Sequence, residues 1–160
     1  MKLTRTFASA AVALAATAGV IGLSATGASA ASGYEDTFSK SRCTSSGACT
    51  ALGAGVDYDG ARSVRLKAVV KDAPGDSSCT VVKARIYSRT GAQIGKTVTV
   101  GSACDGRTVT LAAKRISTST SEIARVKVYS QVGTSSTTTV ISDNCYRSSD
   151  SYKGTPDSCR

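Results

Sequence analysis

The chain has 160 residues, with 20 basic and 11 acidic side chains, six cysteines and no histidine. This length suits a single domain of ordinary size, and the basic balance favours acidic partners or polyanionic surfaces. The lack of histidine excludes Ser-His and Cys-His nucleophile pairs. The chain also has no C-x-x-C pair, and this absence together with the lack of histidine argues against a zinc site.

The first thirty residues have the pattern of an export signal. Lys2 and Arg5 precede an almost unbroken apolar run from 7 to 23, and 28–30 read Ala-Ser-Ala, a small-x-small cleavage site. The run is rich in Ala, Thr and Gly, and no basic cluster follows it, which argues against a membrane-spanning helix. We therefore expect a signal peptide over 1–30, a secreted extracellular protein and no membrane span.

The next segment, 31–50, is rich in Ser, Gly, Ala and Thr and has little periodicity. Such a composition predicts a flexible N-terminal arm. Tyr34 and Phe38 are the large aromatic residues of this arm. They are candidates for anchoring a partner, or they dock on the parent domain.

From residue 51 onward, apolar and polar side chains alternate with period two, and no segment has a helical stripe. Asp-Gly, Pro-Gly and Thr-Gly pairs separate the runs, as turns between strands do. About seven antiparallel strands favour an all-β, immunoglobulin-like sandwich over a closed barrel, with 51–160 as its domain and a disulfide-pinned C-terminal tail. The expected strands are 51–57, 63–71, 81–88, 94–100, 107–113, 123–130 and 137–141. The residues expected to face the core are Val64, Leu66, Val82, Ile86, Val109, Leu111, Val126 and Val128.

The six cysteines all follow the expected signal peptide. An even number in an exported chain predicts three disulfides. Several pairings are possible and the sequence alone does not choose among them, but the order of the cysteines suggests that neighbours pair. These neighbours are Cys43 with Cys49, Cys79 with Cys104, and Cys145 with Cys159.

One short pattern occurs twice in the body. Residues 82–88 and 124–130 share the order apolar, basic, apolar, basic, apolar, Tyr, Ser, and 64–68 repeat its first five positions. In a strand, the basic residues and the Tyr lie on the face opposite the core. If the strands share a sheet, that face is a candidate binding surface; otherwise it is the solvated side of half-exposed strands. Its expected members are Arg65, Lys67, Lys83, Arg85, Tyr87, Arg125, Lys127 and Tyr129.

No catalytic constellation is recognisable in the sequence. Glu35 and Glu122 are its two glutamates, and most aspartates adjoin Gly, Asn or Ser, where they favour turns. No nucleotide-binding loop follows Gly53-Ala54-Gly55. We expect a protein that is not an enzyme and that needs no cofactor and no metal. Without a recognised motif, a nucleic-acid partner is not expected.

The Ala-, Thr- and Gly-rich leader, the polar arm and the short all-β body resemble small exported proteins of filamentous actinobacteria. Among these, the layout over residues 1–160 is similar to that of the small adaptor subunits of umbrella-shaped antibacterial toxin particles. In that family, the adaptor joins a lectin to the repeat ring of a large toxin protein, and its N-terminal stretch engages the ring. The resemblance implies partner contact at 31–42, through Tyr34 and Phe38.

The sequence thus favours a secreted interaction protein, an adaptor in an extracellular toxin complex, whose partner is another secreted protein. One alternative is a β-sandwich that binds a small ligand or an anionic polymer. Another is an inhibitor of secreted hydrolases that presents the loop between Cys43 and Cys49. The candidate partner-binding residues are Tyr34, Phe38, Lys83, Arg85, Tyr87, Arg125, Lys127 and Tyr129.

Overall fold

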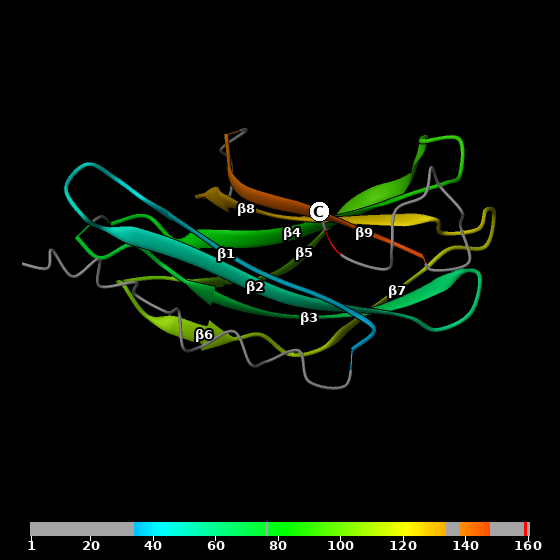
Figure 1. The fold of residues 1–160 in the computed structure, drawn as a ribbon, viewed down its shortest axis with the longest axis horizontal. Helices are drawn as coiled ribbons and strands as arrows, with labels where there is room; N and C mark the ends of the chain where they lie inside the picture. Colours follow the sequence, from blue (N-terminus) through cyan, green and yellow to red (C-terminus); the bar gives the residue numbers. More distant parts are fainter. Residues whose placement is uncertain (1–33, 76, 134–137, 148–158, 160) are drawn as a thin grey trace, which may run out of the picture.

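The computed structural model describes residues 34–75, 77–133, 138–147 and 159. Within these ranges the chain forms strands and turns but no helix, and the strands lie in two layers (Figure 1). The signal peptide expected over 1–30 lies outside the described residues. The strands are β1 (Asp36–Cys43), β2 (Cys49–Tyr58), β3 (Ser63–Lys71), β4 (Thr80–Tyr87), β5 (Gln93–Ala103), β6 (Thr108–Thr110), β7 (Lys114–Ser117), β8 (Arg125–Val132) and β9 (Thr139–Tyr146).

The first sheet has the order β1-β2-β3-β6, and β7 pairs with β3 as well. β6 pairs with the end of β3 near Lys71, whereas β7 pairs with its beginning near Ser63. The run expected as one strand over 107–113 therefore becomes the short β6, and the chain pairs with β3 again as β7. This second pairing is one reason why the described residues form nine strands where about seven were expected.

The second sheet has the order β5-β4-β8-β9, and all of its neighbours are antiparallel. β4 and β8, which carry the two full copies of the repeated pattern, are neighbours. β3, which carries the shorter copy, belongs to the first sheet. The condition that all three strands share a sheet is therefore not met for β3, because the connection after β3 crosses from one sheet to the other. Arg65 and Lys67 do not share a face with the residues of β4 and β8.

The core lies between the two sheets and is built by the alternating apolar residues. Seven of the eight predicted core residues are buried, and Val109 is half-buried and packs against the others. Gly101 on β5 allows the sheets to approach closely at one point, because a Cβ atom there would lie 2.7 Å from Leu111. The all-β class and the two-sheet arrangement are confirmed. The seven predicted core residues that are buried are Val64, Leu66, Val82, Ile86, Leu111, Val126 and Val128.

β1 lies in the middle of the segment 31–50 that we expected to be a flexible arm. It pairs with β2 along its whole length, and Phe38 is buried in the core. The edges of the two sheets meet where β1 lies beside β9 (Figure 1), and Lys40 forms an ion pair of 3.1 Å with Asp143 of β9. The arm prediction is wrong for residues 36–43, because polar residues suit an edge strand as well as a flexible segment.

All three suggested disulfides are confirmed. Cys43–Cys49 joins β1 to β2 beside the turn between them, and Cys79–Cys104 fastens the end of the sandwich where β4 begins and β5 ends. Cys145–Cys159 ties residue 159 to β9. Three disulfides fit a protein that folds in an oxidising compartment.

Asp72 reinforces the end of the sandwich that Cys79–Cys104 closes. Its buried carboxylate accepts a hydrogen bond of 2.5 Å from the hydroxyl of Thr80 and one of 3.4 Å from the amide of Gly106. A buried carboxylate needs such donors, because burial without them costs several kcal/mol. Asp72 therefore has a structural role at this end of the sandwich.

Candidate functional site

The two full copies of the repeated pattern face each other across β4 and β8. The register pairs Lys83 with Tyr129, Arg85 with Lys127, and Tyr87 with Arg125. All six side chains lie on the outer face of the second sheet, because the residues between them point into the core. We call these six residues the cationic face. The expectation that they share one surface is confirmed for β4 and β8.

Tyrosine rings hold the cations of this face in place. The guanidinium of Arg125 lies 4.0 Å from the centroid of the Tyr87 ring. Tyr129 has the guanidinium of Arg85 at 5.2 Å from its ring centroid and the ammonium of Lys127 at 6.0 Å. Such contacts are attractive, because the face of an aromatic ring carries partial negative charge.

The neighbouring strands surround these six residues with neutral side chains. Thr97 of β5 accepts a hydrogen bond of 3.1 Å from Nε of Arg85. On β9, Ser142, Asn144 and Tyr146 lie opposite Tyr129, Lys127 and Arg125 respectively. No Asp or Glu occupies a described position on the outer side of β4, β5, β8 or β9. Asp143, the carboxylate of β9, points to the inner side and pairs with Lys40.

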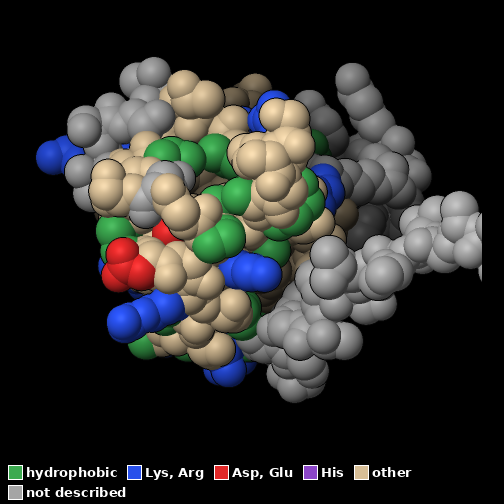
Figure 2. Space-filling view, turned by 90° about the vertical axis from the view of Figure 1, so that its left-hand side faces the viewer, with side chains coloured by type: hydrophobic (Ala, Val, Ile, Leu, Met, Phe, Trp, Pro, Cys, Tyr) green, Lys and Arg blue, Asp and Glu red, His purple; other side chains and the backbone are tan. Residues whose placement is uncertain are grey.

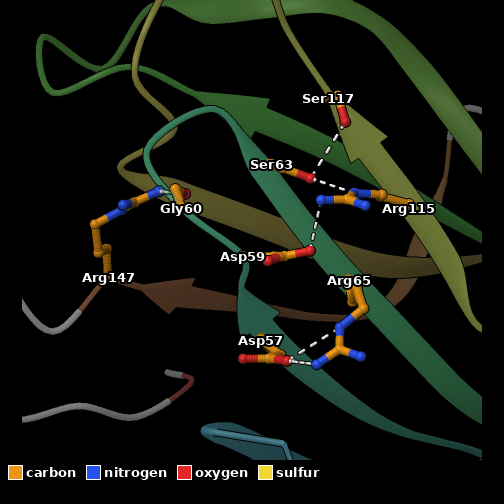
Figure 3. A network of polar contacts seen from close by, with 8 residues as sticks. All are labelled: Asp57, Asp59, Gly60, Ser63, Arg65, Arg115, Ser117 and Arg147. Carbon is orange, nitrogen blue, oxygen red and sulfur yellow. Dashed lines mark hydrogen bonds and ion pairs between the residues drawn. The ribbon is translucent and has the colours of Figure 1, made fainter.

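The outer side of the first sheet is organised in the opposite way, with its arginines paired to carboxylates. Arg65 donates from Nε to Asp57 at 3.1 Å, and Arg115 forms an ion pair of 2.6 Å with Asp59 (Figure 3). The hydrogen bond to Asp57 and the attraction between the two charges raise the pKa of Arg65 above its usual range, and Asp59 and Tyr34 add to the rise. These arginines already have counter-charges within the protein.

The two candidate residues of the expected arm do not join the cationic face. Phe38 is part of the core between the sheets and is not available to a partner. Tyr34 is half-buried and lies two residues before β1, a strand of the first sheet. The structure therefore separates the eight candidate residues into a cationic face of six, a core residue and a residue near the opposite sheet.

Within the cationic face, Tyr129 is only 3% exposed, whereas the other five residues are half-buried. The expected direct contact of Tyr129 with a partner stays a prediction, but the structure leaves its side chain almost no exposed surface for such a contact. Its position against Arg85 and Lys127 makes it a support for two cations. The half-buried members of the cationic face are Lys83, Arg85, Arg125, Lys127 and Tyr87.

Arg147, which the sequence reasoning missed, fastens the other end of the sandwich. It donates from a terminal nitrogen to the carbonyl of Gly60 at 2.7 Å (Figure 3). It also donates from Nε to the carbonyl of Ile123 at 2.9 Å. It also lies 4.9 Å from the centroid of the Tyr58 ring. Its side chain is 11% exposed, so its role is structural. No local sequence signal marks it, because its partners lie in distant segments.

The end of the molecule that carries the β1–β2 turn shows no comparable gathering of cations among its described residues. Basic and acidic side chains are scattered there among hydrophobic and small polar ones (Figure 2). Among the residues that the structure describes, no group of His, Cys, Asp and Glu could hold a metal ion, and no helix is long and apolar enough to span a membrane. The cationic face is therefore the candidate functional site.

No protein-family model matches the chain, and neither a curated protein nor a solved structure is significantly similar to it.

Proposed function

We propose that this chain is a secreted, non-enzymatic binding protein that uses the cationic face to hold an anionic partner. One observation carries the proposal: four cations occupy adjacent positions on two paired strands, on a face where no described position holds a carboxylate. The chain does not avoid ion pairs in general, because the arginines of the opposite sheet have them. An external anion would add a counter-charge to this face.

The register makes this arrangement costly for the free protein. Arg85 and Lys127 lie directly opposite each other, and like charges in that position destabilise a sheet. A neutral residue in either place would relieve the repulsion without disturbing the core. The repulsion is relieved equally well when an anion binds between the two cations, which supports a binding role for this surface.

The cations are also held in place before a partner arrives. Arg85 is bound to Thr97 and lies against Tyr129, while Arg125 lies over Tyr87. Long basic side chains otherwise lose considerable rotamer freedom on binding, so holding them beforehand lowers the entropic cost. Tyr and Arg are also the residue types in which interface energy concentrates.

Secretion is part of the proposal. The export signal expected over 1–30 and the three disulfides support it, because disulfides persist in oxidising compartments. We further propose an immunoglobulin-like architecture. Strands distant in sequence are neighbours in each sheet, β3 and β6 in the first and β4 and β8 in the second, which supports this proposal. An adaptor role in a toxin particle remains a proposal that rests on layout, and the burial of Phe38 removes one of its two expected contacts.

The test compares two double variants that remove the same charge from opposite sheets. Arg85→Ser/Lys127→Ser alters the cationic face, and Lys67→Ser/Lys71→Ser alters the outer side of the first sheet. Heparin, poly-glutamate and poly(glycerol phosphate) are the probes, with affinity measured by calorimetry at low and high salt. We expect the first variant to lose most of its affinity and the second to retain it. Equal losses in both variants, or no binding by the unaltered protein, would contradict the proposal.

A further inference from the structure

The two copies of the repeated pattern are related by a local two-fold axis. In the antiparallel register, the axis passes between Arg85 and Lys127 and exchanges residues 82–88 with 124–130. It therefore exchanges Lys83 with Arg125 and Tyr87 with Tyr129. The sequence of either copy alone does not show this two-fold relation. The relation exists only because the strands pair in the register that places Arg85 opposite Lys127.

This register arranges the four cations in three rows across the strands. The first row holds Lys83, the middle row holds Arg85 and Lys127, and the third holds Arg125. Successive rows lie about 7 Å apart, the spacing of two residues along a strand. Because the end cations belong to different strands, the four charges form a diagonal track across β4 and β8.

We propose that this track binds a linear phosphodiester polymer, with three successive phosphates on the three rows. The inference rests on the proposed function and names the partner class for the same surface. The charges of such a polymer lie in its backbone, so they recur at a fixed interval along the chain, as the rows do. Arginine suits phosphate because its planar guanidinium can donate two parallel hydrogen bonds, and lysine binds phosphate as a point charge.

The local axis gives the track a further property. A polymer that runs from Lys83 to Arg125 meets the same order of charges as one that runs the other way, so both directions of the polymer can bind. A fragment with two phosphates can bind in two registers, on the first and middle rows or on the middle and third. A fragment with three phosphates has one register that uses every row.

The experiment uses glycerol-phosphate oligomers with one, two, three and four phosphates, with binding to the full disulfide-bonded protein measured by calorimetry. Affinity should rise steeply up to three phosphates and then level off. Lys83→Ser and Arg125→Ser should each weaken binding of the three-phosphate oligomer about tenfold, the loss of one charge-assisted contact. The same variants should weaken binding of the two-phosphate oligomer at most about twofold, because a second register survives.

Arg85→Ser should weaken binding of both oligomers, because every register uses the middle row. Lys67→Ser on the opposite sheet is the matched control and should change neither. Melting temperature and the absence of free thiols verify that each variant is folded. Equal effects of Lys83→Ser on the two- and three-phosphate oligomers would overturn the three-row track. If the protein bound poly-glutamate or heparin but not these oligomers, the phosphodiester inference would fail while the proposed function stood.

Discussion

The guanidinium of Arg125 lies 4.0 Å from the centroid of the Tyr87 ring, and the two residues face each other across β8 and β4. A cation over an aromatic ring at a partly exposed site contributes about 0.5–1 kcal/mol. We expect a double-mutant cycle with Tyr87→Leu and Arg125→Met to give a coupling free energy of this size, measured by denaturant unfolding. Tyr87→Phe should preserve the coupling, because the ring remains. If the coupling vanished in the Tyr87→Phe protein, the interaction would depend on the hydroxyl of Tyr87 and not on its ring.

The pairing of Arg85 with Lys127 predicts a conflict between stability and binding. Lys127→Glu would place a carboxylate opposite Arg85 and replace repulsion by attraction, so the free energy of unfolding should rise by about 0.2–1 kcal/mol. The same variant should lose its affinity for polyanions, because the middle row no longer carries two positive charges. Chemical denaturation and calorimetry test the two effects separately. A Lys127→Glu protein that is less stable than the original would show that repulsion between Arg85 and Lys127 does not lower the free energy of unfolding.

The burial of Phe38 predicts that β1 belongs to the folded body. Phe38→Ala should lower the free energy of unfolding by about 3 kcal/mol, because it leaves a cavity between the sheets. Tyr34→Ala is the comparison from the same segment and should cost less, since Tyr34 is only half-buried. Unfolding in denaturant, followed by circular dichroism, measures both. Unchanged stability in Phe38→Ala would return this segment to the role of a flexible arm.

The disulfides should differ in their contribution because they close loops of different length. Cys79–Cys104 spans a sequence separation of 25, and Cys43–Cys49 one of 6. From the entropy of loop closure, replacing the first pair by alanine should cost about 3.5 kcal/mol and replacing the second about 2 kcal/mol. Melting temperatures of the two double-alanine proteins test this order. The reverse order would mean that the short β1–β2 disulfide acts through the folded state.

The sequence by itself determined which residues of each strand point inward. Val64, Leu66 and Val126 could be assigned to the core because alternation with period two is a local property of an extended chain. The paired cysteines followed a similarly short-range rule, since each one bonds to its neighbour along the chain. The failure at β1 has the same origin, because an edge strand rich in Ser and Thr carries little alternation to detect.

Only the tertiary structure decided which strands are neighbours, and with that the composition of the candidate site. The first five positions of the repeated pattern occur in β3, β4 and β8 alike, but β3 lies in the other sheet, where Arg65 meets Asp57. Arg85 lies opposite Lys127 because two segments more than forty positions apart in the sequence pair with each other. Such pairings are selected by the packing of the whole core, because a sheet gains its stability from contacts between distant strands, and no single segment of sequence encodes that sum.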